Sequence, residues 1–98
     1  MLKKRFFKTK DDCEVTFHVT AEGAEHVELV CEANGWEPIV MKKAKNGSFR
    51  ARLRVPKQAR YQFRYLIDNT SWANDDAADG SCRNEFGGEN SILDTTPG

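Results

Sequence analysis

Apolar residues recur at every second position over much of this chain, and that period restricts the possible folds more than any other feature. Residues 47–55 alternate an apolar side chain with a basic or small polar one, and residues 15–19 repeat the pattern. Successive side chains of a β-strand point to opposite faces, so this alternation is typical of strands with one buried face. No stretch of ten or more residues keeps the 3.6-residue period of an amphipathic helix. The sequence therefore predicts an all-β protein.

Turn-forming residues separate the expected strands. Asn34-Gly35 and Asn46-Gly47 suit tight turns, because asparagine and glycine accept a positive φ at low cost. Pro56 ends the strand at residues 47–55, since proline has no N–H to donate to a sheet. The remaining segments are expected to be strands at residues 26–31, 39–41, 61–67 and 91–93, and a long acidic loop at residues 74–88. This spacing predicts a β-sandwich of about seven antiparallel strands.

A single domain over residues 1–98 is expected, because a chain of 98 residues is too short to build two hydrophobic cores. Its 15 Lys and Arg balance its 15 Asp and Glu, but the charges are unevenly distributed. Residues 42–64 contain nine basic residues and no acidic one, whereas residues 68–94 contain seven acidic residues and one basic residue, Arg83. Because the two totals are equal, the chain has no overall basic excess that would favour nucleic acid.

A cytoplasmic location without a membrane segment is expected. The basic start of the chain, residues 1–7, is followed by Lys8, Lys10 and two aspartates, which interrupt the apolar region that a signal peptide needs. The longest apolar runs, such as residues 39–41, are far too short to span a bilayer. Three cysteines without a CxxC pair do not make a disulfide framework, and this favours a reducing compartment.

No metal, cofactor or catalytic site is expected. Residues 75–86 fail the calcium-loop pattern, because Ala77 occupies the third position and Phe86 the twelfth. The cysteines and the two histidines lack the paired spacing of zinc ligands. Without a GxSxG turn or a recognisable pair of catalytic carboxylates, the protein is not expected to be an enzyme. Cys13 and Cys31 are expected to be buried as small apolar residues.

Residues 42–64 interleave basic and aromatic side chains, a combination that nucleic-acid-binding surfaces use. The alternation in residues 47–55, however, places the arginines and the apolar residues on opposite faces of one strand. We therefore expect the apolar side to be core and the basic side to be a solvated sheet face. No nucleic-acid partner is expected.

The two tryptophans bear most directly on function. Trp36 follows an Asn-Gly turn and Trp72 follows residues 69–71, so each is expected at a loop or strand edge, where full burial is difficult. An exposed indole can contact the apolar C–H face of a pyranose ring, whose hydroxyls need amide, hydroxyl and guanidinium partners. Alternatively, both tryptophans cover the ends of the sandwich core. Their positions in the sequence leave both alternatives open.

Short motifs follow one another along residues 25–93. They are VELV at 27–30, NGW at 34–36, GSF at 47–49, YQFRYLID at 61–68, the single Trp72, and FGGENS at 86–91. In this order they resemble the isoamylase N-terminal, or glycogen-binding, carbohydrate-binding module family, which is also found in the β subunit of AMP-activated protein kinase. The resemblance implies an early-set, immunoglobulin-like β-sandwich that binds glycogen and maltooligosaccharides, or that precedes or regulates α-glucan enzymes.

The resemblance also implies sugar-binding roles for five residues. Trp36 and Trp72 would be stacking platforms, and Arg64, where the family commonly has lysine, would donate to sugar hydroxyls. Phe86 would press an apolar side chain against the sugar, and Asn90 would contribute an amide hydrogen bond.

The chain departs from the family pattern in three places. Cys31 and Ala33 stand where the family usually has glycine and phenylalanine, so the packing beneath the NGW turn must differ. Gly88 replaces a residue that can carry a hydroxyl, which removes one possible sugar contact. Asn69 stands in the place of a turn glycine, with one extra residue before the second tryptophan, and asparagine tolerates the left-handed region that this turn needs.

The sequence and the resemblance together predict a non-catalytic, free-standing module that binds α-glucans such as glycogen or maltooligosaccharides. The chain ends before any catalytic barrel, so no enzyme domain is expected to follow. The alternative is a protein-interaction or regulatory module that docks a glycogen-metabolising enzyme without binding sugar itself. The tryptophans or the basic sheet face of Arg50, Arg52 and Arg54 would then form the interface.

Overall fold

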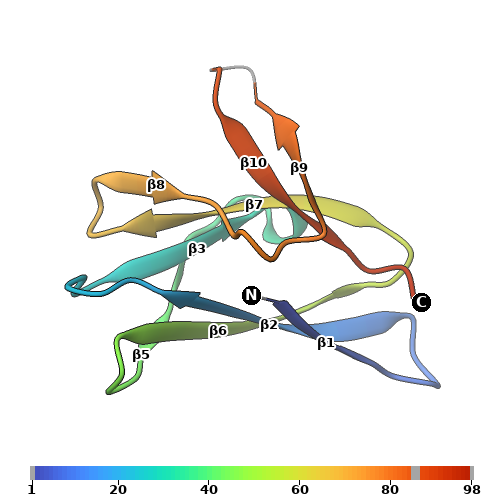
Figure 1. The fold of residues 1–98 in the computed structure, drawn as a ribbon. Coiled ribbons are helices and arrows are strands. Elements are labelled where there is room, and N and C mark those ends of the chain that lie inside the picture. The colour runs from blue at the N-terminus through green and yellow to red at the C-terminus, as the bar shows by residue number, and fades with distance from the viewer. Residues whose placement is uncertain (1, 85–86, 98) are drawn as a thin grey trace.

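The computed structural model describes residues 2–84 and 87–97, and these residues form ten β-strands and one turn of 3₁₀ helix (Figure 1). In chain order the elements are β1 (Leu2–Phe6), β2 (Asp12–Thr20), β3 (Val27–Cys31), η1 (Glu32–Asn34), β4 (Ile39–Val40), β5 (Lys42–Lys43), β6 (Ser48–Pro56), β7 (Arg60–Ile67), β8 (Ser71–Ala73), β9 (Gly80–Arg83) and β10 (Glu89–Asp94). Over the described ranges no helix is long and apolar enough to cross a membrane.

The strands form two antiparallel sheets that pack against each other (Figure 1). One sheet has the order β1-β2-β6-β5. The other has the order β4-β3-β7-β10-β9, and β8 pairs with β7 on the same edge as β10. With β8 and β9 set aside, these are the ABED and CFG sheets of immunoglobulin domains with one extra edge strand, β4. The predicted all-β, immunoglobulin-like sandwich is confirmed.

The chain has more strands than the seven or so that the sequence predicts. β5 and β8 contain two and three residues, too few to show an alternating pattern. β9 lies within the predicted loop of residues 74–88, which is therefore wrong for residues 80–83. Its residues are polar or small because β9 pairs with β10 through its backbone and contributes no side chain to the buried core.

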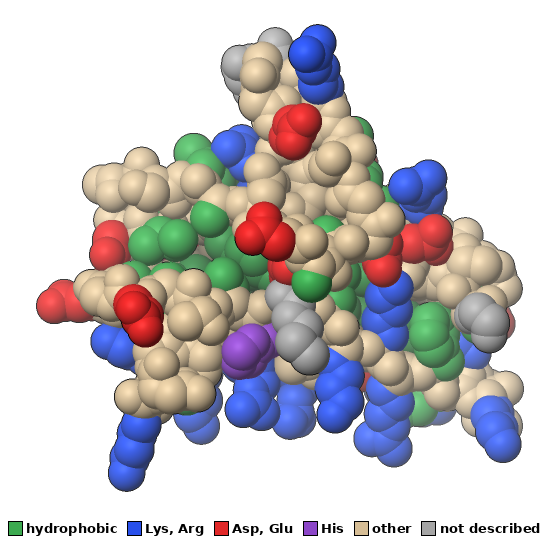
Figure 2. All heavy atoms as spheres, viewed as in Figure 1, with side chains coloured by type: hydrophobic (Ala, Val, Ile, Leu, Met, Phe, Trp, Pro, Cys, Tyr) green, Lys and Arg blue, Asp and Glu red, His purple; other side chains and the backbone are tan. Residues whose placement is uncertain are grey.

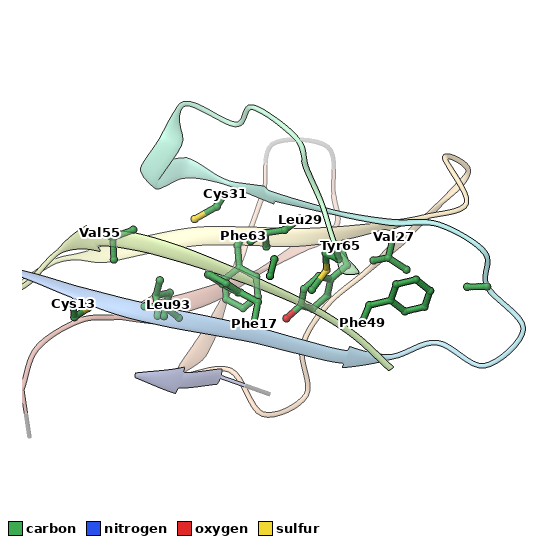
Figure 3. Close-up of a cluster of buried hydrophobic side chains, with 14 residues drawn as sticks. Cys13, Phe17, Val27, Leu29, Cys31, Phe49, Val55, Phe63, Tyr65 and Leu93 are labelled. Atoms are coloured by element: carbon green, nitrogen blue, oxygen red, sulfur yellow. The ribbon is translucent and has the colours of Figure 1, made fainter. Parts of the chain in front are cut away.

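The core lies between the sheets and consists mainly of the inward side chains of β2, β3, β6 and β7 (Figure 3). Phe63 packs edge-to-face against two other rings, with 5.1 Å between its centroid and that of Phe17, and 5.7 Å to that of Tyr65. Cys13 and Cys31 are fully buried free thiols, as predicted. Burial raises the pKa of both thiols. Both therefore remain protonated small apolar groups of the core.

The outer side of the four-stranded sheet is strongly basic. Its outward side chains include Lys3, Arg5, Lys42, Arg50, Arg52 and Arg54, which we call the basic face. Figure 2 shows lysine and arginine side chains gathered along this side of the molecule. Along β6 the arginines alternate with Phe49, Ala51 and Val55, which are buried. The prediction of a solvated basic face opposite an apolar core is confirmed.

Candidate functional site

A hollow of about 470 Å³ lies on the outer face of the six-stranded sheet. We call it the Trp36–Trp72 hollow, and its lining residues are Val30, Trp36, Gln62, Arg64, Trp72, Arg83, Asn84 and Asn90. The lining residues of β3 and β7 alternate with core residues, so the hollow opens away from the core. Four of the five predicted site residues belong to this set. The fifth, Phe86, lies outside the described residues.

Trp36 is presented by a tight turn that follows β3. After η1 the chain adopts a left-handed conformation twice in succession, with φ of 75° at Gly35 and 67° at Trp36. The Trp36 N–H donates to the Cys31 carbonyl at 2.9 Å, and the Gly35 N–H donates to the Glu32 carbonyl at 3.1 Å. Trp36 is left 40% exposed. A positive φ at a bulky residue is strained, so holding this ring at the surface lowers the stability of the fold.

Trp72 and Arg64 are in direct contact. Trp72 lies on β8 opposite Leu66 of β7, and its side chain is 51% exposed. The Arg64 Cζ atom lies 4.6 Å from the centre of the Trp72 ring, a cation–π stack. Arg64 Nε is buried, and none of the described residues accepts its hydrogen. The guanidinium thus covers part of the indole that the resemblance assigns to sugar stacking, and it keeps an unused donor beside the ring.

Asn90 lies in a row of hydrogen-bonded amides along the hollow. Its side chain is buried, its Nδ2 donates to Gln62 Oε1 at 2.8 Å, and its Oδ1 accepts from Asn84 Nδ2 at 3.3 Å. Asn84 Oδ1 in turn accepts from the Gly88 N–H at 3.0 Å. We call these four residues the amide chain. Asn90 therefore positions its neighbours as well as lining the hollow.

Sequence reasoning missed four lining residues. Gln62 could have been found, because it lies two positions before Arg64 on β7 and must share its face. Val30 pairs directly with Arg64 across the sheet, a register that requires the strand partners to be known. Arg83 and Asn84 fall in the segment that the sequence predicts to be a loop, where no periodic signal assigns a face.

A second hydrogen-bond network holds the segment after β8 against the core. The hydroxyl of the buried Tyr65 donates to Asp75 Oδ2 at 2.8 Å. Ser91 Oγ accepts from the Asp75 N–H and donates to Asn74 Oδ1, both at 2.9 Å. Burial acts to raise the pKa of the Asp75 carboxyl, but hydrogen bonds, those from the Ala77 N–H and the Tyr65 hydroxyl among them, hold it below its ordinary value. The network ties the end of β8 to β10.

Together, fold and site define a β-sandwich that presents two indoles, a stacked guanidinium and a row of amides on the outside of one sheet. No protein-family model and no curated protein matches this chain. Within the described residues, no carboxylate, histidine, serine or cysteine lines the hollow, and no group of three or more His, Cys, Asp or Glu is placed to hold a metal ion. The hollow offers apolar ring surface and hydrogen-bond donors.

Proposed function

We propose that this chain is a non-catalytic cytoplasmic module that binds α-glucans such as glycogen and maltooligosaccharides. The observation that carries the proposal is that both tryptophans line one hollow and both are substantially exposed. Indoles buried in the core or at opposite ends of the sandwich could not contact the same ligand. The free, buried thiols of Cys13 and Cys31 fit a reducing compartment.

The chemistry of the hollow suits a saccharide. A pyranose has apolar C–H faces, which Trp36 and Trp72 can contact, and a rim of hydroxyls, which need hydrogen-bond partners. Gln62 and Arg64 supply such partners within the same hollow. Base–aromatic stacking is worth about 1–3 kcal/mol per ring, and a similar scale for sugars, less the ordering costs, gives micromolar to millimolar affinity.

Calorimetric titration with maltoheptaose tests the proposal. We expect saturable binding to the natural chain and at least a tenfold loss in Trp36→Ala and Trp72→Ala, since about 1.4 kcal/mol corresponds to tenfold. Val40→Ala is the matched control, because Val40 is a large exposed apolar residue that does not line the hollow. Unchanged binding in both tryptophan variants, or no binding by the natural chain, would contradict the proposal.

Docking of a glycogen-metabolising enzyme is a second candidate function, and the basic face favours it. Within the described residues Lys42, Arg50 and Arg52 form no ion pair. The sequence places Arg54 in the same interface as Arg50 and Arg52, but Arg54 already has partners. Its Nε lies 2.8 Å from Asp12 Oδ2 in an ion pair, and its Cζ lies 4.5 Å from the centre of the Phe7 ring. A docking surface would therefore centre on Arg50 and Arg52.

Charge reversal tests this second candidate. Binding to purified glycogen branching and debranching enzymes would be measured by interferometry with the natural chain and with the double variant Arg50→Glu, Arg52→Glu. A docking role predicts binding that weakens at high salt and disappears in the double variant. Binding that neither salt nor charge reversal changes would exclude the basic face as the interface.

A further inference from the structure

The polar lining of the Trp36–Trp72 hollow is dominated by hydrogen-bond donors. The orientation of the amide chain is fixed at one end, because the backbone N–H of Gly88 can only donate and Asn84 Oδ1 accepts from it. Asn84 therefore turns its Nδ2 to Asn90 Oδ1, and Asn90 turns its Nδ2 to Gln62 Oε1. The side-chain carbonyl oxygens of all three amides thus already have a donor.

Several N–H groups of the lining remain available to a ligand. Gln62 Nε2 makes no hydrogen bond to any described residue, and Asn90 Nδ2 has a second hydrogen beyond the one it gives to Gln62. The guanidinium groups of Arg64 and Arg83 add further donors and two positive charges. Arg64 Nε is buried without a partner among the described residues, so a ligand oxygen that reaches it would offset the cost of its desolvation.

No carboxylate offsets these charges within the described lining of the hollow. The Glu32 carboxylate is not among the lining residues, and its Oε1 accepts from the backbone N–H of Gln62 at 3.2 Å. Glu89 is the cross-strand neighbour of Arg83, but these two described side chains form no ion pair. The described lining of the hollow therefore carries two guanidinium charges and no carboxylate.

We propose that this hollow selects α-glucans that carry a phosphate monoester over the neutral polymer, an inference that rests on the proposed function. A neutral hydroxyl donates as well as accepts, and the described lining of this hollow offers its O–H group no carboxylate acceptor. A phosphate monoester offers several acceptor oxygens and a negative charge, which match two guanidiniums and the remaining amide donors. A single carboxylate, with two oxygens, would use fewer of these donors.

Paired titrations test the inference with maltoheptaose and with maltoheptaose phosphorylated at one glucose 6-hydroxyl. At low salt we expect the phosphorylated oligosaccharide to bind about tenfold more tightly, and we expect that ratio to fall as salt is added. Arg83→Gln should lower the ratio, because it removes one of the two charges in the hollow. Arg50→Gln is the matched control, since it removes the same charge from the basic face on the other sheet.

The possible results distinguish the phosphate preference from the proposed α-glucan binding on which it rests. Equal affinity for the two oligosaccharides would overturn the phosphate preference and leave α-glucan binding intact. Binding of neither oligosaccharide would overturn both proposals. A preference that Arg50→Gln and Arg83→Gln reduce equally would mean that the field of the whole molecule, not the hollow, attracts the phosphate, and this also overturns the inference.

Discussion

At the scale of single residues, the candidate site stores backbone strain. Trp36 is held at a φ of 67°, a conformation that costs a residue with a Cβ about 1–2 kcal/mol. Glycine would adopt this conformation freely, yet it could not contact a ligand. Under the proposed function, the tryptophan at this position serves binding rather than folding.

This strain gives a prediction that separates stability from binding. Trp36→Gly should be about 1 kcal/mol more stable than Trp36→Ala, because both lose the indole and only alanine keeps the strain. Both variants should bind maltoheptaose at least tenfold more weakly than the natural chain. Urea unfolding gives the stability and calorimetry gives the binding. An alanine variant as stable as the glycine variant would show that the turn carries no strain.

A second prediction for a single residue concerns Asp75 and the pH dependence of stability. Its pKa is lower in the folded chain than the ordinary value of 3.8, so the unfolded chain takes up the proton more readily and stability falls as the pH drops through this range. Asp75→Asn should cost about 1 kcal/mol at neutral pH, and less below pH 3.8. Urea unfolding at both pH values measures this.

The exposed neighbour Asp76 provides the matched control, since Asp76→Asn removes the same charge outside the network. It should change stability little at either pH. A penalty for Asp75→Asn that stays constant from neutral pH into acid would contradict the account of its carboxylate.

At the scale of elements, one turn sets the position of β8 and therefore of Trp72. Asp68 begins the turn between β7 and β8 with a φ of 50°. Its Oδ1 accepts from the N–H groups of Glu25 and His26, both at 2.9 Å, which ties this turn to the chain entering β3. The Asp68 side chain thus adds a link between this turn and the start of β3, beside the backbone pairing of β8 with β7.

Substitution of Asp68 should therefore affect both stability and binding. Asp68→Ala removes the acceptor and places alanine at a positive φ, and we expect a loss of about 1–2 kcal/mol with weaker maltoheptaose binding. Asp68→Asn keeps an Oδ1 acceptor and tolerates the left-handed conformation, so it should retain most of both. Equal losses in the two variants, measured by urea unfolding and calorimetry, would exclude this role for the Oδ1 atom.

How much of the core each strand covers determined whether the strand could be predicted from the sequence. β2, β6 and β7 were predictable because each covers the core along its whole length and so alternates apolar with polar residues. β8 and β9 were not, because they are held by backbone pairing at the edge of the larger sheet. Asn84 of the amide chain follows β9, so its place beside Asn90 gave no signal in the sequence, whereas Gln62 shares the face of Arg64 on β7 and could have been found.

At the scale of the whole molecule, two unlike surfaces lie on opposite sheets. The basic face covers the four-stranded sheet, and the Trp36–Trp72 hollow opens on the six-stranded sheet, with the core between them. A ligand in the hollow would leave the basic face accessible. Sugar binding and partner docking are therefore compatible in one chain, and substitutions on one sheet should leave the other function unchanged.

The central claim is that one saccharide contacts both indoles, and the chain's two tryptophans make this directly measurable. In a nitrogen-labelled sample each indole N–H gives one resonance, assigned by Trp36→Phe and Trp72→Phe. On titration with maltoheptaose, both resonances should shift along a saturating curve with one shared Kd. Indole signals that stay in place while resonances of the basic face move, or a shift of one indole alone, would contradict the account.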